Sequence, residues 1–413
     1  MHSATTICGT KDRRSTSRFS RNPALRRLAV ATSAGVMASA VFSALLLLAA
    51  HPALAQTQNV LYNFTNTPDG GYPESGLVLD AAGNLYGTTL YGGVHGRGSV
   101  FMITPAGTET QLYSFTGGVD GDVPVAGLAL DKKTGNLYGT TLYGGASGNG
   151  AVFRVTPSGT ETVLYSFAGG TDGANPYSGL VRVGTTLYGT TDAGGAYGYG
   201  TVFKVTAGGK ETVLHSFNSA FPTLDGAHPY AGLVLYKGIL YGTTRYGGAS
   251  NLGTVFSITK AGAETVLCSF QGGADGAYTY AGVAFDKSGS IYGTTYSGGT
   301  DNAGTVFKLT GAGAESILHS FVRDGVDGLN PQASLTFDRG NFYGTTLQGG
   351  PANIGTVFEV TPAGTETVLY QFTGGTDGGY PYAGLVLGKK NTLYSTTYQG
   401  GSSNYGTVFR LVP

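Results

Sequence analysis

Short runs of apolar and β-branched residues alternate with turn residues along most of the chain. In one representative stretch the runs are residues 179–181, 187–191, 201–206 and 211–217. Runs of this length bounded by Gly, Pro, Asn and Asp are typical of β-strands. The turns between them supply the glycine and proline that tight hairpins require. The pattern therefore predicts an all-β protein built from groups of four short strands.

One motif, N-L-Y-G-T-T or a close variant, recurs at nearly constant spacing. Its tyrosines are separated by 52, 50, 53, 51, 51 and 51 residues, and they are Tyr86, Tyr138, Tyr188, Tyr241, Tyr292, Tyr343 and Tyr394. A period of about 50 residues with four strands per copy indicates a β-propeller blade. The repeats begin with a lone strand of the fourth type, 60–64, and end after a strand of the third type, 406–411. We therefore predict a seven-bladed propeller over residues 56–413, in which the N-terminal strand completes the last blade and removes a free sheet edge.

The consensus of the copies resembles a known bacterial repeat. It runs G-L-V-x-D-x-x-G-N-L-Y-G-T-T-x-x-G-G and continues G-T-V-F-x-x-T-P-x-G-x-E-T-V-L-Y-S-F. This pattern is similar to the GloVer tandem repeat of bacterial extracytoplasmic proteins of the choice-of-anchor type, and the resemblance covers residues 60–413. It implies an exported protein, often attached to the cell surface, and it implies no catalytic residue.

The first 55 residues differ from the repeats. A basic stretch reaches Arg27, an apolar run follows over 28–50, and Ala53-Leu54-Ala55 precede Gln56. This order is typical of a signal peptide, so we predict cleavage after Ala55 and a secreted, periplasmic or cell-surface protein. The apolar run is also long enough to span a bilayer, and an uncleaved anchor is the alternative.

Composition and charge exclude one class of partner. The chain has 71 glycines, no tryptophan and only 12% charged residues, which suits a protein rich in turns. The first 55 residues hold seven of the 24 basic residues and one of the 24 acids, so the remainder has 17 basic against 23 acidic residues, a net charge of −6. An acidic body with no basic cluster lacks what nucleic-acid binding requires. We expect no nucleic-acid partner, a monomer, and a glycan or an extracellular protein as the target.

One aspartate per copy lies in the long loop from a fourth strand to the next first strand. In a propeller this loop shares a face with the loop between the second and third strands, and we call that side the loop face and the opposite side the hairpin face. The aspartates, each followed by glycine, are Asp69, Asp120, Asp172, Asp225, Asp275, Asp327 and Asp377. They are weak candidates for a hard cation such as calcium. An Asp-Gly turn is the favoured interpretation, so we expect no cofactor.

Tyrosines crowd the same face. Tyr280 and four others lie in the long loops, and two of these loops, 218–229 and 322–331, are longer than the rest. Flat amphipathic rings at a solvated rim suit stacking on sugars or docking of a protein, and packing between neighbouring loops is the alternative. The candidate ligand-binding residues are Tyr72, Tyr177, Tyr230, Tyr382, Phe221, His228 and Arg323.

Candidates for catalysis are few. His215, His319 and Cys268 occupy a fourth-strand position that other copies fill with tyrosine, and we interpret them as strand substitutions rather than metal or acid–base groups. The off-pattern polar residues of the loop face show no triad or metal spacing, and they are Glu74, His95, Arg97, Asp122, Asp192, His228, Arg245 and Asp301. A glutamate recurs before the fourth strand on the hairpin face, where we expect solvated turn residues: Glu109, Glu161, Glu211, Glu264, Glu315 and Glu366.

These observations predict a non-enzymatic binding propeller, with no catalytic residue assigned. The alternative is an extracellular lyase or hydrolase that acts on a polymer or a lactone. Convergence of the off-pattern acids and histidines at the mouth of the channel would favour the enzyme, and scatter would favour the binding protein, because fold alone does not decide function.

Overall fold

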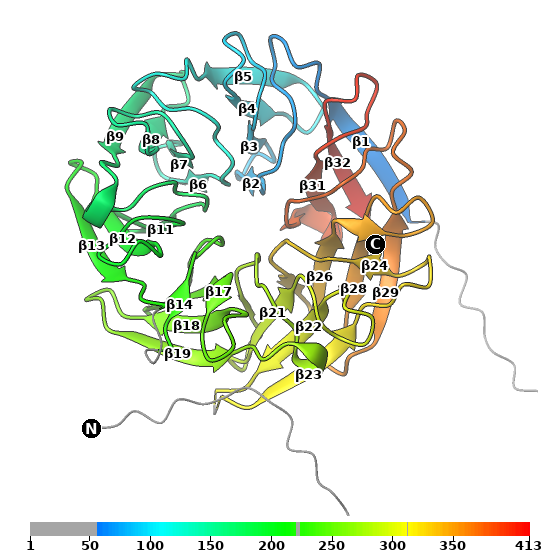
Figure 1. Cartoon of the computed structure of the whole chain (residues 1–413). Coiled ribbons are helices and arrows are strands. Elements are labelled where there is room, and N and C mark those ends of the chain that lie inside the picture. Colours follow the sequence, from blue (N-terminus) through cyan, green and yellow to red (C-terminus); the bar gives the residue numbers. More distant parts are fainter. Residues whose placement is uncertain (1–55, 220–223, 312) are drawn as a thin grey trace, which may run out of the picture. The chain divides into compact units, whose positions relative to one another are not determined.

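The computed structural model describes residues 56–219, 224–311 and 313–413. They form seven four-stranded antiparallel sheets arranged around a central channel (Figure 1). Within a sheet the strands follow one another from the channel outwards, and only the last sheet takes a strand from the other end of the chain. The predicted seven-bladed propeller is confirmed.

The strands fall into four classes by their place in the blade. The inner strands are β2 (Val78–Leu79), β6 (Ala129–Leu130), β10 (Val181–Val183), β15 (Val234–Tyr236), β20 (Ala284–Phe285), β25 (Thr336–Asp338) and β30 (Val386–Leu387). The second strands are β3 (Leu85–Thr89), β7 (Leu137–Thr141), β11 (Thr186–Thr191), β16 (Ile239–Thr244), β21 (Ile291–Thr295), β26 (Asn341–Thr346) and β31 (Leu393–Thr397). The third strands are β4 (Ser99–Ile103), β8 (Ala151–Val155), β12 (Thr201–Thr206), β18 (Thr254–Ile258), β22 (Thr305–Leu309), β28 (Thr356–Val360) and β32 (Thr407–Val412). The outer strands are β5 (Glu109–Ser114), β9 (Glu161–Ser166), β13 (Glu211–Ser216), β19 (Glu264–Ser269), β23 (Glu315–Ser320), β29 (Glu366–Gln371) and β1 (Thr57–Asn63).

We number the blades from one to seven in the order of their inner strands. Loop ladders join β14 (Gly226–Ala227) to β17 (Tyr246–Gly247) and β24 (Gly328–Leu329) to β27 (Gln348–Gly349). The described helical elements are single 3-10 turns, η1 (Gly170–Asp172), η2 (Gly273–Asp275) and η3 (Lys389–Asn391). None of the described helices is long or apolar enough to cross a membrane. The predicted signal segment, 1–55, lies outside the described residues.

The N-terminal strand closes the ring. β1 pairs antiparallel with β32, from Thr57 opposite Val412 to Asn63 opposite Thr407. Blade seven therefore has the order β1, β32, β31, β30, with its outer strand supplied by the start of the repeat region. The closure that the strand register predicted is present, and it gives the third strand of the last blade the partner that every other third strand has.

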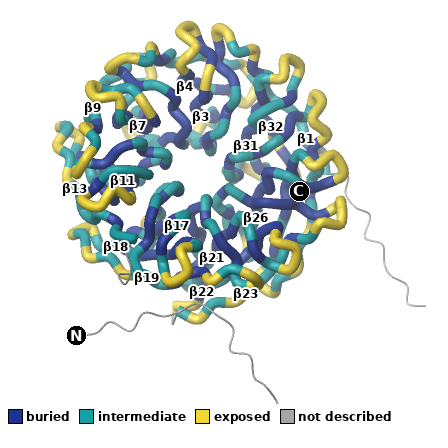
Figure 2. The backbone as a smooth tube through the Cα atoms, in the orientation of Figure 1, coloured by how far each residue is buried: buried dark blue, intermediate teal, exposed yellow. Residues whose placement is uncertain are grey.

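Burial follows the classes of strand (Figure 2). The second and third strands are almost wholly buried, whereas the outer strands are mostly half-buried. The second strand carries a glycine in blades one to six, where a phenylalanine of the third strand lies over it, and blade seven has Ser395 at this position. A Cβ on Gly139, for example, would come within 2.5 Å of the Phe153 ring. The close approach of this ring explains why a glycine stands inside a strand, where glycine otherwise lowers stability.

Neighbouring blades meet through a second phenylalanine, the residue that follows each outer strand. Its ring packs edge to face on the third-strand phenylalanine of the next blade, with ring centroids 5.0–5.3 Å apart at all seven joints. The pairs are Phe64–Phe101, Phe115–Phe153, Phe167–Phe203, Phe217–Phe256, Phe270–Phe307, Phe321–Phe358 and Phe372–Phe409. Aromatic pairs of this geometry add about 0.5–1.5 kcal/mol to the burial of the rings.

A β-bulge between the third and outer strands increases the twist of each blade. In blade three Val202 pairs with His215 and Phe203 with Val213, which leaves Leu214 unpaired, and corresponding register shifts recur around the ring. Bulges bend the strand that carries them. The end of each outer strand is thereby turned toward the next blade.

Most predicted strand boundaries agree with the structure to within one residue, but β1 begins at Thr57, three residues before the predicted strand 60–64, and the inner strand differs as well. Residues 179 and 180 were predicted in an inner strand, but β10 begins at Val181. Gly179 lines the channel mouth instead, and Leu180 is buried between blades two and three.

Deleting residues 56–65 will destabilise the propeller far more than the loss of ten terminal residues normally does. The deletion removes β1 and the fully buried Phe64, whose ring alone contributes about 3 kcal/mol or more by analogy with Phe-to-Ala substitutions. The measurement is urea unfolding of chains that begin at residue 56 and at residue 66. Equal unfolding midpoints would show that β1 does not close the ring.

Candidate functional site

The loop face is held together by backbone hydrogen bonds between blades. In every copy one residue of the long loop has a left-handed backbone, with φ of 54–59°, and these are Tyr72, Val123, Asn175, His228, Tyr278, Asn330 and Tyr380. In the loop between blades one and two, the backbone N–H of Val123 donates to the backbone carbonyl of Arg97 in blade one. The carbonyl of Val123 accepts a hydrogen bond from the backbone N–H of Leu142 in blade two. The same two bonds recur at the other six loops. Side chains carried by these loops therefore stand on a rigid frame.

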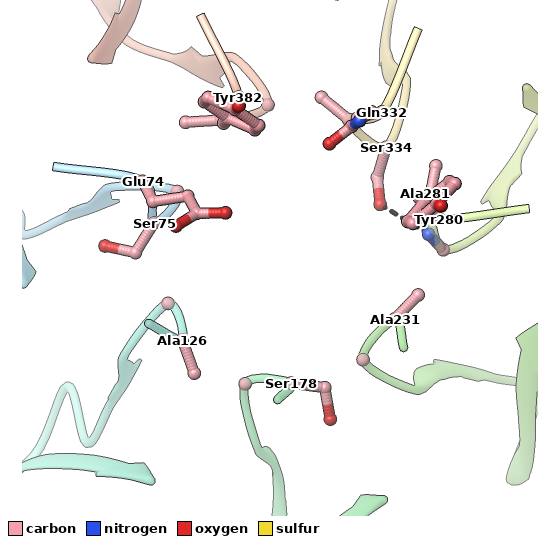
Figure 3. Close-up of a pocket in the computed structure, with 18 of the residues that line it drawn as sticks. Glu74, Ser75, Ala126, Ser178, Ala231, Tyr280, Ala281, Gln332, Ser334 and Tyr382 are labelled. Atoms are coloured by element: carbon pink, nitrogen blue, oxygen red, sulfur yellow. Dashed lines mark hydrogen bonds between the residues drawn. The ribbon is translucent and has the colours of Figure 1, made fainter. Parts of the chain in front are cut away.

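The channel mouth is lined by one equivalent position from each blade. The seven residues are Glu74, Val125, Tyr177, Tyr230, Tyr280, Gln332 and Tyr382, and they surround a cavity of about 310 Å³ (Figure 3). Small residues that follow them, among them Ser75, Ser178 and Ser334, complete the wall. The cavity therefore combines tyrosine rings with a few polar groups, which is the usual make-up of a site for a small ligand.

Glu74 is the one carboxylate among the described residues that line this cavity. Its carboxyl group points into the mouth (Figure 3). Burial raises the pKa of Glu74 to about 7, because the surrounding protein solvates the charged form poorly. Near neutral pH the group therefore changes between a hydrogen-bond donor and an anion.

The four tyrosines of the mouth remain neutral phenols. Burial raises the pKa of Tyr177, Tyr230 and Tyr280, and it raises the pKa of Tyr382 to about 12. The rings of Tyr177 and Tyr230 lie 3.9 Å apart at an angle of 30°. Such rings offer flat faces for stacking and hydroxyl groups for hydrogen bonds.

A cationic side chain, Arg245, contacts one of the four tyrosines that line the channel mouth. The guanidinium of Arg245 lies 4.7 Å from the ring centroids of both Tyr246 and Tyr280. Nearby, His228 Nδ1 lies 3.6 Å from Asp192 Oδ1, and the hydrogen bond to Asp192 raises the pKa of His228. These charged groups lie beside the mouth, over blades three and four, and only Glu74 of the off-pattern residues lines the cavity.

The remaining off-pattern residues lie apart from the mouth. Arg97 forms an exposed ion pair with Asp122 at 3.1 Å, and His95 is exposed. Asp301 accepts a hydrogen bond from the backbone of Arg323 within blade five. The off-pattern acids and histidines are thus scattered over the loop face rather than gathered into one catalytic group.

The structure brings together only part of the predicted ligand-binding set. Tyr177, Tyr230 and Tyr382 line the mouth with Tyr280, which the predicted set omitted. Tyr72 instead packs against three tyrosines, Tyr91, Tyr398 and Tyr405, so the alternative of loop-to-loop packing holds there. His228 and Arg323 lie outside the cavity lining, and Phe221 lies outside the described residues.

Each of the seven aspartates lies where the outer strands of two neighbouring blades come close to each other. We call these seven places the outer joints. Each carboxylate accepts a backbone N–H at the start of its own loop, as Asp120 does from Thr116 at 2.8 Å. Tyr113 Oη of the outer strand donates to Asp120 as well, at 2.9 Å. Burial opposes the charged form of Asp120, but these hydrogen bonds outweigh it and lower its pKa. These contacts are those of the Asp-Gly turn that the sequence favoured.

The recurring glutamates are not the solvated residues that the sequence predicted. The glutamate that begins each of these outer strands lies near the aspartate of the joint with the preceding blade. Burial, and then the charge of Asp120, raise the pKa of Glu161 to about 7, and its Oε1 atom is buried without a hydrogen-bond partner among the described residues. The equivalent glutamates Glu109, Glu211, Glu264 and Glu366 also have pKa values near 7, and burial raises the pKa of Glu315. At the closing joint Gln58 takes this position and donates to the backbone carbonyl of Asp377.

The fourth-strand substitutions also lie at outer joints. His215 and His319 replace the tyrosine and contact Asp225 and Asp327 at 3.0 and 3.1 Å. Burial opposes protonation of His215, but Asp225 outweighs it and raises the pKa. Cys268 is fully buried in the core between blades four and five.

Comparison with protein families identifies the repeat. The model of the Gloeobacter/Verrucomicrobia repeat matches residues 48–184, 130–287 and 279–413, which together span the propeller. The chain belongs to this repeat family. The resemblance that the consensus motif indicated is thereby confirmed. A search of curated proteins finds no significant match to the repeat protein.

Solved structures share its fold at low identity. The extracellular domain of a one-component system from Bacteroides thetaiotaomicron superposes with a TM-score of 0.55 at 10% identity, over 86% of this chain and 40% of that one. Oligogalacturonate lyase from Vibrio parahaemolyticus gives 0.52 at 10% identity, over 87% and 97%. A gluconolactonase from Xanthomonas campestris gives 0.43 at 18% identity, over 73% and 91%. At 10% identity the first two structures, whose TM-scores exceed 0.5, show a likeness of fold alone.

The buried glutamates predict that the repeat protein loses stability as the pH rises from about 4.5 to 7. Folding raises their pKa, so in this range the folded state binds more protons than the unfolded state, and deprotonation favours unfolding. The thermal midpoint should therefore be higher at pH 5 than at pH 8. Glu161→Gln, which copies the joint at Gln58, should reduce the difference, and Gln58→Glu should increase it. A midpoint that rises from pH 5 to pH 8 would contradict the burial of these groups.

Proposed function

We propose that this repeat protein is a carbohydrate-binding propeller that takes the end of a glycan at the mouth of its channel. The observation that carries the proposal is the set of four tyrosines, one glutamate and one glutamine at equivalent positions around the cavity. Aromatic rings stack on the apolar faces of sugars, while carboxyl, amide and hydroxyl groups bind their hydroxyls. The rigid loop frame supports this assignment, because a preordered site binds with less loss of entropy.

The charge of the mouth favours a neutral glycan. Glu74 supplies the one carboxylate of the described lining, no Lys or Arg is among these lining residues, and Arg245 beside the mouth is already held near two tyrosine rings. An acidic sugar would meet the anionic form of Glu74 without a free positive partner. We therefore expect neutral oligosaccharides to bind more tightly than uronic acids of the same size at pH 8.

An enzymatic role is the second candidate, and the raised pKa of Glu74 is the observation that favours it. A buried carboxyl group that titrates near neutral pH suits a general acid or base. A glycoside hydrolase ordinarily uses two carboxyl groups, whereas the described lining holds one. The scatter of the other off-pattern acids and histidines supports binding over catalysis.

Replacing Tyr382 with Ala should weaken capture of a neutral oligosaccharide about tenfold, which corresponds to about 1.4 kcal/mol. The ligand is first identified on a glycan array and the affinity is then measured by titration calorimetry. Tyr197→Ala is the matched control, because Tyr197 is an exposed tyrosine of the loop face outside the cavity lining. If Tyr197→Ala weakens capture and Tyr382→Ala does not, the ligand binds at the rim and the proposed site is wrong.

Glu74→Gln separates binding from catalysis. The variant keeps the size and hydrogen-bonding capacity of the side chain, so a binding protein should retain its affinity within a few fold. Mass spectrometry of the captured glycan after prolonged incubation should show it unchanged with the native chain. Cleavage by the native chain that Glu74→Gln abolishes would establish the enzymatic alternative.

We also propose that the protein is exported, on the basis of the basic and apolar segments that precede Gln56. Expression of the full chain in a bacterium should place the protein outside the cytoplasm with Gln56 at its N-terminus, as read by N-terminal sequencing. A chain that keeps Met1 and stays with the membrane would support the uncleaved anchor instead.

A further inference from the structure

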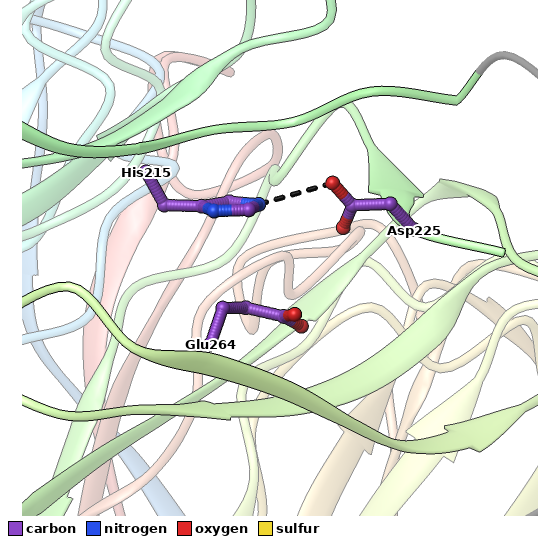
Figure 4. Close-up of side chains that lie close together, drawn as sticks. All are labelled: His215, Asp225 and Glu264. Atoms are coloured by element: carbon purple, nitrogen blue, oxygen red, sulfur yellow. Dashed lines mark hydrogen bonds and ion pairs between the residues drawn. The ribbon is translucent and has the colours of Figure 1, made fainter. Parts of the chain in front are cut away.

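Two outer joints differ from the others in the chemistry of their side chains. Between blades five and six, His319 of β23, Asp327 of the following loop and Glu366 at the start of β29 come together. Between blades three and four, His215, Asp225 and Glu264 form the same arrangement (Figure 4). In each group a nitrogen and two carboxylate oxygens lie within 4.8 Å of one another.

The histidine changes what the joint can bind. At the tyrosine joints a phenol O–H donates to the aspartate, and a neutral phenol has little capacity as a metal ligand at neutral pH. The imidazole Nε2 occupies the corresponding place, 3.1 Å from Asp327 Oδ2 in one joint and 3.0 Å from Asp225 Oδ2 in the other. One imidazole with two carboxylates is a set of donors that Zn²⁺ accepts, with a further coordination position left for water.

At each of these joints a single imidazole faces two carboxylates, so at most one positive charge of the protein meets two negative ones. Each brings two carboxylates together, and Asp324 adds a third acid near Glu366. Among the described residues, neither Lys nor Arg forms an ion pair with these aspartates and glutamates. The Oε1 atoms of Glu264 and Glu366 are buried without a hydrogen-bond partner in the described structure. Buried carboxylates are costly unless they are paired or coordinate a metal.

The backbone already fixes the aspartates. Asp327 accepts N–H groups from Val322 and Gly328, and its own N–H donates to Asp324. Asp225 accepts the corresponding N–H groups from Asn218 and Gly226. Secondary contacts of this kind orient carboxylate ligands of metal sites. The three ligands also come from two blades, so a bound ion would connect the outer strands of neighbouring blades.

We propose that the two histidine joints are Zn²⁺-binding sites that tie blade three to blade four and blade five to blade six. Each ion takes His Nε2, one oxygen of the aspartate and one oxygen of the glutamate. The sites are independent of ligand capture at the channel mouth. Binding stabilises the folded chain by mass action, because the ligands are assembled only when adjacent blades are in place.

The test is equilibrium dialysis of the metal-free full chain against ZnCl₂, with bound zinc measured by atomic emission. Two equivalents are expected, and the thermal midpoint should rise with zinc and return with a chelator. His319→Tyr and Glu366→Gln should each bind one equivalent, and His215→Tyr with His319→Tyr should bind none. Tyrosine is the residue that the chain itself uses at four other outer joints, so these variants keep a joint that the fold accommodates.

Two control variants should still bind two equivalents. Tyr370→Phe disturbs an outer joint that lacks histidine, and His95→Ala removes an exposed histidine of the loop face. Cobalt(II) provides a second readout, since its visible ligand-field absorption reports the donor set and should be lost in the double tyrosine variant. The absence of bound zinc in the native chain overturns the proposal, and so does zinc that the double variant retains.

Discussion

Each blade reaches its neighbour through the same two aromatic rings, and the rest of the molecule depends on that contact. The third-strand phenylalanine needs the space above a glycine, and the phenylalanine that ends the previous outer strand needs the edge of that ring. Both rings are fully buried at most joints. Because the geometry is the same at every joint, including Phe64 on Phe101, seven equal steps complete the circle. The contact fixes the angle between blades and leaves the loops free to differ.

Because the phenylalanine contact fixes the angle between blades, the seven copies differ from one another mainly in their loops. Residues of the phenylalanine contact hardly change from copy to copy, whereas the position represented by Glu74 holds tyrosine in four blades, valine in one and glutamine in one. The tyrosine position of the outer joint varies less, with histidine and cysteine as its substitutes. The residues that line the mouth are not members of the phenylalanine pairs. The mouth thus carries four kinds of side chain at the seven equivalent points of a regular ring.

Most of the fold could be predicted from the sequence because it is set by short-range patterns repeated seven times. The short apolar runs predicted the strands, and the constant spacing of the tyrosines predicted the seven blades. The lone fourth-type strand at the start of the repeats predicted that the N-terminus completes the last blade. The fate of the recurring glutamates could not be predicted that way. Glu161 is next to a turn in sequence, and only the bulge and twist of the outer strand bring it against Asp120 of another blade.

Only part of the candidate site could be predicted from the sequence. Tyr177, Tyr230 and Tyr382 could be chosen as loop tyrosines, but Tyr72 belongs to the same loops and is packed among other rings. What separates them is their place relative to the residue that follows the left-handed one, which is proline in six copies and Thr279 in the seventh. Tyr72 precedes this position, and the tyrosines of the mouth come directly after it. Alignment of the seven copies at this position would have found Glu74 and Gln332 as members of one ring.

Closure by β1 also determines when this molecule can become complete. Thr57 is paired with Val412, so the joint that finishes the circle links the first part of the propeller to be synthesised with the last. Until β32 exists, Phe64 can pack only on Phe101 of blade one, and β1 remains without the strand that it pairs with. Contacts between such distant parts of a chain are slow to form, because a long loop must close first. Blades one to six consist of consecutive strands, but blade seven and the closed ring can be completed only after β32 has been synthesised.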